Sequence, residues 1–105
     1  MKQEHLLQTS IIQYLRLKKI LVFAVPNGAK RNLFVAKQLK DEGVLAGVSD
    51  LIIVLKNKVV FVEIKTNKGR QQKTQKEFQK KVEELGHDYL IWRSIDDAIR
   101  FVENY

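Results

Sequence analysis

The chain has 105 residues, of which 45% are hydrophobic and 30% are charged, and it contains no cysteine. This composition is typical of one globular domain with a modest core, and it excludes a disulfide framework and a thiolate zinc site. No apolar run approaches the roughly 18 residues of a membrane span, and the first residues lack the apolar core of a signal peptide. We therefore expect a single domain over residues 1–105 that resides in the cytoplasm and has no membrane partner.

The net charge of +7 is distributed unevenly along the chain. Residues 18–40 contain six basic residues and no acid, and residues 65–81 contain seven basic residues and one acid, Glu77. A regional excess of positive charge is typical of a surface that binds nucleic acid. The alternative is an ordinary lysine-rich surface in contact with water.

The hydrophobic pattern predicts eight elements. Steps of four, such as Leu7, Ile11 and Leu15, indicate a helix, and short runs of β-branched and aromatic residues indicate strands. Ser94 and Asp97 form a capping-box pattern at the start of the last helix. The order α-β-α-β-β-α-β-α predicts an α/β fold with a mixed sheet of about four strands flanked by helices. In chain order we expect a helix at 3–18, a strand at 20–25, a helix at 31–42, strands at 50–55 and 59–65, a helix at 71–85, a strand at 89–92 and a helix from 94 to about 103.

The second strand of the predicted hairpin carries an acid and a base on one face. Because side chains alternate along a strand, Glu63 and Lys65 point the same way. A two-residue turn near residues 56–58 would place Asp50 opposite Glu63 or Lys65, on that same face. A three-residue turn would send Asp50 to the other face. For Glu63 and Lys65 alone, an exposed ion pair on a half-wet sheet is the alternative.

Asp50 and Glu63 would then lie within a few ångströms of each other. Two carboxylates this close repel each other unless a cation neutralises both. Mg²⁺ binds one or two carboxylates together with water and substrate phosphate. Such a metal polarises a phosphoryl oxygen and supplies hydroxide near neutral pH. A neighbouring lysine can orient or deprotonate the attacking water, or offset charge in the transition state. The pattern of Asp50, Glu63 and Lys65 therefore predicts phosphodiester hydrolysis, with the backbone carbonyl of Ile64 as a further metal ligand.

An Asp at the start of one strand, followed by Glu-x-Lys at the end of the next, resembles the PD-(D/E)XK nuclease superfamily. More narrowly, the chain is similar to a stand-alone VRR-NUC domain. Ser49 stands where the superfamily nominally has proline. The residues that carry the resemblance extend over most of the chain and are Glu4, residues 26–28 (PNG), Arg31, Gly43, residues 47–51 (GVSDL), residues 62–65 (VEIK), Gly69 and Gln75.

The resemblance implies a restriction-endonuclease-like core and a DNase that depends on Mg²⁺ or Mn²⁺. Asp50, Glu63 and the Ile64 carbonyl would be the metal ligands. Lys65 would be the catalytic lysine.

The resemblance also implies roles for two residues outside the hairpin. Glu4 would be an accessory acid that helps to hold metal or water, and its position on the apolar face of the first helix supports this role. The alternative is a fraying N-terminal residue that faces water. Gln75 would reach the metal site or the scissile phosphate, and simple exposure at the start of its helix is the alternative.

Two groups of residues are candidates for contact with DNA. The first lies between a strand and a helix, where backbone N–H groups and cations hold phosphate, and the second follows the catalytic strand. The alternatives are a simple turn for the first group and ordinary surface residues for the second. Tyr89 and Trp92 are expected in the core and not as platforms for base stacking. The candidate DNA contacts are Asn27, Lys30, Arg31, Lys68, Arg70 and Lys73.

We expect a structure-selective DNA endonuclease that resolves four-way (Holliday) junctions as a homodimer. Minimal members of the family that the chain resembles are symmetric homodimers that act on branched DNA, and a two-fold dimer suits a junction of approximate two-fold symmetry. The family also suggests the cytoplasm of a phage-infected or bacterial cell. Two alternatives remain: a non-catalytic basic DNA-binding module on a nuclease-like fold, and a nuclease that acts on flap, linear or single-stranded DNA.

Overall fold

The computed structural model describes residues 2–26 and 33–105, and its elements follow the order predicted from the sequence. The α/β fold class is therefore confirmed, with element ends that differ from the prediction by a few residues. No helix in the described part of the chain combines the length and apolar character needed to cross a membrane. The elements are α1 (Lys2–Leu17), β1 (Leu21–Ala24), α2 (Leu33–Asp41), β2 (Leu51–Val54), β3 (Val59–Ile64), α3 (Lys73–Glu84), β4 (Asp88–Trp92) and α4 (Ile95–Glu103).

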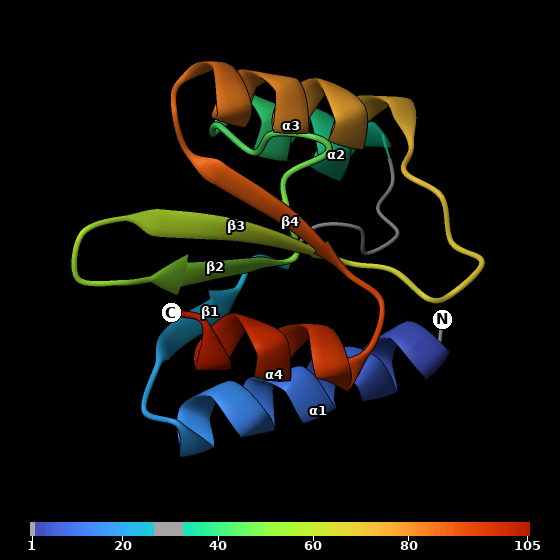
Figure 1. The fold of residues 1–105 in the computed structure, drawn as a ribbon. Coiled ribbons are helices and arrows are strands. Elements are labelled where there is room, and N and C mark those ends of the chain that lie inside the picture. Colours follow the sequence, from blue (N-terminus) through green and yellow to red (C-terminus); the bar gives the residue numbers. More distant parts are fainter. Residues whose placement is uncertain (1, 27–32) are drawn as a thin grey trace.

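The four strands form one mixed sheet in the order β1-β2-β3-β4 (Figure 1). The pairs β1–β2 and β2–β3 are antiparallel, whereas β3 and β4 are parallel. A parallel pair needs a long crossover, and α3 supplies it. In the hairpin, Val54 pairs with Val59, and the N–H of Leu55 donates to the carbonyl of Lys58 at 2.8 Å. The turn therefore holds two residues, which is the length that brings Asp50 to the face of Glu63.

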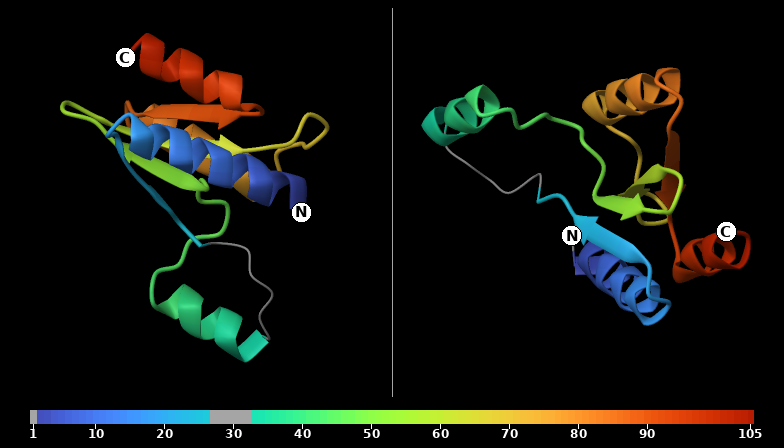
Figure 2. Two further views of the ribbon diagram at one scale, coloured as in Figure 1. Left: turned by 90° about the horizontal axis from the view of Figure 1, so that it is seen from below. Right: turned by 90° about the vertical axis from the view of Figure 1, so that its left-hand side faces the viewer.

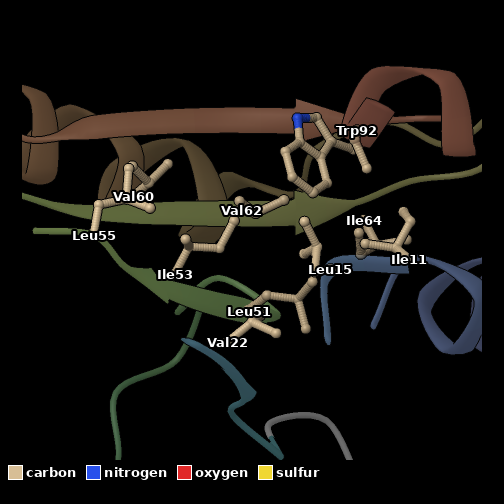
Figure 3. Close-up of a cluster of buried hydrophobic side chains, with 11 residues drawn as sticks. Ile11, Leu15, Val22, Leu51, Ile53, Leu55, Val60, Val62, Ile64 and Trp92 are labelled. Carbon is tan, nitrogen blue, oxygen red and sulfur yellow. The ribbon is translucent and has the colours of Figure 1, made fainter. Parts of the chain in front are cut away.

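The main hydrophobic core lies between the sheet and the pair α1 and α4, on the lower side of the sheet in Figure 1. Alternate β3 residues, Val60, Val62 and Ile64, point into this core together with Ile11 and other side chains of α1 (Figure 3). Each fully buried aliphatic side chain contributes about 1.5–3 kcal/mol to folding. The apolar side chains that recur along α1 and alternate along β3 thus bury one face of the sheet.

The opposite face of the sheet is covered by α3 over β4 and part of β3. The Phe78 ring of α3 packs edge-on against Phe61 and Tyr89, with ring centroids 5.6 and 6.0 Å apart. The cover does not reach β1, where Leu21 and Phe23 are 62% and 43% exposed. This face therefore has an aromatic cluster under α3 and an open apolar edge at β1.

The helix α2 stands away from the rest of the molecule and packs on no other helix or strand in the described residues (Figure 2). The segment after α2 rejoins the rest of the fold at Gly47, which lies against Thr74 of α3. A Cβ atom at Gly47 would lie 2.3 Å from the backbone oxygen of Thr74, and the φ of Gly47 is +86°. Only glycine fits this approach, so the segment leading to Asp50 is fixed against the start of α3.

Candidate active site

The structure brings Asp50, Glu63 and Lys65 together at the end of the hairpin away from its turn. Leu51 pairs with Val62, so the next residues outward, Asp50 and Glu63, lie opposite each other. The Lys65 Nζ lies 3.4 Å from Glu63 Oε2. Glu63 is 1% exposed and Lys65 is 8% exposed. The alternative of an exposed ion pair is therefore wrong, because both charged groups are buried.

Hydrogen bonds next to the ends of the strands fix the position of this group. The N–H of Ile64 donates to Asp50 Oδ2 at 2.7 Å, and the Asp50 carbonyl accepts the N–H of Val25 at 2.9 Å. The Lys65 N–H donates to the carbonyl of Trp92 at 3.0 Å. The acidic side chain of Asp50 thus leans from β2 toward the end of β3, beside Glu63.

The two oxygens of the Glu63 carboxylate have different surroundings. Oε1 accepts hydrogen bonds from Gln71 Nε2 at 2.9 Å and from the Tyr89 hydroxyl. Among the described residues, Oε2 has no hydrogen-bond partner, and the ammonium group of Lys65 lies beside it. A buried polar atom without a hydrogen bond costs about 1–3 kcal/mol, and such atoms in native proteins are frequently functional.

The donor set fits a hard divalent cation. Carboxylate and backbone oxygens are the ligands that Mg²⁺ and Mn²⁺ prefer, and Glu63 Oε2 is an uncommitted oxygen of this kind. The described residues contain no group of three His, Cys, Asp or Glu side chains that could hold a metal ion. Among the described residues, the carboxylates of this set are therefore those of Asp50 and Glu63, and Glu4 does not join them in a group of three. The role of the Ile64 carbonyl stays a prediction. Mg²⁺ typically completes such a set with water and substrate phosphate.

Burial raises the pKa of Asp50 above its ordinary value. The hydrogen bond from the Ile64 N–H opposes this shift, whereas the nearby charges of Glu4 and Glu63 add to it. Lys65 lowers the pKa again, but less. The half-buried Glu4 of α1 thus lies within electrostatic reach of Asp50. The site holds an excess of negative charge that a bound cation would relieve.

Two residues outside the predicted site, Tyr89 and Gln71, contact Glu63. Tyr89 was expected in the core, and it is 6% exposed, but its hydroxyl contacts Glu63. Burial, and then the hydrogen bond to Glu63, raise the pKa of Tyr89 above its ordinary value, so the hydroxyl stays protonated and donates. Gln71 was expected only as the start of a helix. A buried tyrosine needs a partner for its hydroxyl, which is the one signal in the sequence that points to this contact.

Arg93 holds the loop that follows Lys65. Its Nη1 donates to the carbonyls of Thr66 and Gly69 at 2.7 Å each. Lys68 lies between these two anchors and is exposed. An arginine at the end of a strand gives no signal in the sequence for such a contact, because its acceptors are backbone carbonyls distant along the chain.

The other predicted site residues are placed as follows. The Gln75 side-chain oxygen accepts the N–H of Gln72 at 2.8 Å and so caps α3, and its role at the metal or phosphate stays a prediction. Arg70 and Lys73 are exposed near the start of α3, as a DNA contact requires. The remaining candidates, Asn27, Lys30 and Arg31, lie outside the described residues.

No family model and no curated protein matches the chain, whereas solved structures do. One solved structure that is similar is described as a "VRR_NUC domain protein"; it has a TM-score of 0.72 and 24% sequence identity, over 97% of this chain and 86% of that chain. Another, described as "VRR_NUC domain", has a TM-score of 0.71 and 18% identity, over 97% and 96%. The chain therefore has the fold of a VRR-NUC domain over almost its whole length, and the resemblance in fold that the sequence indicated is confirmed.

Proposed function

We propose that the protein is a metal-dependent DNA endonuclease that resolves four-way junctions as a homodimer. One observation carries the nuclease proposal: Asp50, Glu63 and Lys65 share a buried corner of the sheet in which Glu63 Oε2 has no hydrogen-bond partner among the described residues. The VRR-NUC fold supports the same class of reaction.

The chain's own groups have distinct tasks in this proposal. Asp50, Glu63 Oε2 and the Ile64 carbonyl would hold Mg²⁺ or Mn²⁺, which when bound polarises the scissile phosphate and acidifies a water molecule. Lys65 places a positive charge where negative charge develops on the phosphate, or orients the attacking water. A Cβ atom at Gly69 would lie 3.3 Å from the Lys65 Cδ, so the loop confines the lysine side chain.

The charge of the chain supports DNA as the substrate. The net charge is +7, and the exposed Lys68, Arg70 and Lys73 follow directly after the proposed site. Cations at such positions bind phosphates and determine the register of the duplex without reading its sequence. Arg93 fixes the loop that presents Lys68, so these contacts would be preorganised. A non-catalytic DNA-binding module is less well supported, because buried carboxylates beside phosphates weaken binding.

Exposed apolar side chains support the homodimer. Leu21 and Phe23 lie on the edge strand β1 and are 62% and 43% exposed. Apolar groups gathered on an open edge are typical of a protein–protein interface. A two-fold dimer would present two active sites, as paired incision of a four-way junction requires.

The nuclease proposal is tested with end-labelled four-way junction, flap, linear duplex and single-stranded DNA, each in Mg²⁺, Mn²⁺ or EDTA. We expect metal-dependent cleavage with the junction cut fastest. No cleavage of any substrate in either metal would contradict the enzyme. Cleavage confined to linear or single-stranded DNA would reject junction resolution while leaving a nuclease.

The dimer is tested by light scattering of Phe23→Glu against a matched control. We expect the wild type to be a dimer, and Phe23→Glu to shift it to monomer and to lose paired incision. Leu85→Glu at the end of α3, which covers β4 at the opposite edge of the sheet, introduces the same charge at a site that is 75% exposed and should leave the dimer intact. A wild-type monomer at micromolar concentration would contradict the homodimer.

A further inference from the structure

Glu63 is held by two uncharged donors that meet one of its oxygens. Gln71 Nε2 donates to Oε1 at 2.9 Å, and the Tyr89 hydroxyl donates to the same oxygen. The other oxygen, Oε2, faces Lys65 Nζ at 3.4 Å. The carboxylate is therefore anchored through Oε1, and Oε2 is directed to the corner that Asp50 shares.

The Tyr89 donor is locked by its own packing. Tyr89 lies on β4 directly beside Phe61 of the parallel strand β3, and its ring is 6% exposed. The edge of the Phe78 ring packs against it with centroids 6.0 Å apart. The aromatic cluster under α3 thus fixes the ring, and the ring fixes the position of the hydroxyl at Glu63.

The Gln71 donor is locked by a chain of amides. Its Nε2 donates both to Glu63 Oε1 and to Gln79 Oε1, each at 2.9 Å. Gln79 Nε2 in turn donates to Glu83 Oε2 at 3.3 Å. Because both N–H groups of Gln71 have acceptors, the amide has one preferred orientation. A loop residue is thereby fixed by two turns of α3.

The charge of these donors matters for what Glu63 can bind. An arginine or lysine at Oε1 would cancel part of the negative charge of the carboxylate. A hydroxyl and an amide orient the carboxylate without adding a second positive charge to that of Lys65. Outer-shell donors of this kind commonly orient metal-binding carboxylates.

We propose that Tyr89 and Gln71 are positioning residues that hold Glu63 for a divalent cation, a proposal that rests on the proposed function. They act through Glu63 Oε1 and contact neither the cation nor DNA. Their loss therefore changes the affinity for the cation first, and the chemistry at saturating cation much less.

The test is Mn²⁺ binding to the DNA-free protein, measured by calorimetry. Tyr89→Phe and Gln71→Met should each bind Mn²⁺ about 10–100-fold more weakly than the wild type, and the double variant more weakly than either. Tyr105→Phe and Gln13→Met make the same chemical changes at exposed positions and should bind as the wild type. In junction cleavage, the Mn²⁺ concentration at half-maximal rate should rise by the same factor, whereas the rate at saturating Mn²⁺ recovers.

Three outcomes would overturn this inference, and they differ in what else they affect. Wild-type Mn²⁺ affinity in both variants, with wild-type cleavage intact, would overturn it and leave the proposed function standing. An equal loss of rate at all Mn²⁺ concentrations would do the same, because it would show no effect on cation binding. A wild-type protein that neither binds Mn²⁺ nor cleaves DNA would overturn both. Should Tyr89→Phe lose its native circular dichroism, Gln71→Met decides the question, since Gln71 is a half-exposed loop residue.

Discussion

Burial of side chains has opposite effects on stability on the two faces of β3. On one face, Val60, Val62 and Ile64 are at most 1% exposed and fill an apolar core under α1 and α4. On the other face, Glu63 is also 1% exposed, but it is a carboxylate with one oxygen that lacks a hydrogen bond from the described residues. Burial stabilises the fold on the first face, and on the second it opposes stability and prepares a binding site.

This difference is typical of functional sites, which keep features that lower stability. Substitutions on the two faces should therefore separate activity from stability. Changes to the charged residues of the site face should abolish cleavage and leave the fold intact, whereas truncations in the apolar core should destabilise the fold and leave the cleavage rate per folded molecule unchanged.

The largest effect is expected on the site face at Lys65. Lys65→Ala should lower the rate of DNA cleavage by about 10²–10³-fold or more, because it removes a preorganised charge from the reacting centre. Single-turnover cleavage of a labelled junction measures this, with a thermal melt to show that the fold is kept. Lys56→Ala removes an exposed lysine of the hairpin turn, at the end away from the site, and should cut normally. Normal cleavage by Lys65→Ala would contradict the assigned site.

On the core face, Ile53→Ala should lower the free energy of unfolding by about 2–5 kcal/mol, since it leaves a cavity at a fully buried position. Denaturant unfolding measures this, and the cleavage rate per folded molecule should not change. The neighbouring Ile52 lies on the other face and is only partly buried, so Ile52→Ala should cost clearly less. Equal losses in the two variants would contradict the difference between the faces.

Gly47 tests whether the close contact with α3 fixes the segment that leads to Asp50. Gly47→Ala should destabilise the protein by about 1–3 kcal/mol or more and reduce cleavage, because the new Cβ would meet the Thr74 backbone 2.3 Å away. Gly43 has a φ of +103° but nothing within 4 Å of an added Cβ. Gly43→Ala therefore adds backbone strain without a close contact, and it should destabilise the protein less than Gly47→Ala does. Similar unfolding curves for the two variants would show that the close contact is unimportant.

The smallest effect is expected from Asp50→Asn on the metal-free protein. The pKa of Asp50 is raised in the folded state, so the folded protein disfavours its ionised form, and stability falls as pH rises through the folded pKa. Asparagine keeps an oxygen for the Ile64 N–H and has no charge. Asp50→Asn should thus melt slightly higher than the wild type at neutral pH, and about equally at a pH below the unfolded pKa.

The same thermal melts include a control variant and a measurement with added metal. Asp96→Asn, an exposed change in the first turn of α4, should give no gain in stability. Added Mn²⁺ should raise the melting temperature of the wild type but not that of Asp50→Asn. A lower melting temperature for metal-free Asp50→Asn would contradict the excess negative charge at the site.

Local patterns in the sequence were sufficient to predict the elements. They predicted the face of Asp50 only on condition that the hairpin turn holds two residues, and the structure supplies that length. The contacts of Tyr89 and Arg93 could not be predicted in this way. Their partners are brought close by the crossover through α3, and the register of a parallel pair is not set by any turn.

The position of α2 could not be predicted from the sequence either. An amphipathic pattern shows that a helix has an apolar face, but it does not show whether that face packs within the chain or elsewhere. The helix was expected to flank the sheet, whereas it stands apart from the other described elements (Figure 2).

Anomalous diffraction from crystals soaked in Mn²⁺ tests most directly whether the site face of β3 binds a catalytic metal. The account predicts an anomalous peak at coordination distance from Asp50, Glu63 Oε2 and the Ile64 carbonyl, which disappears in Glu63→Gln. A well-ordered site without a peak at this position, in a protein that cleaves DNA in Mn²⁺, would contradict it.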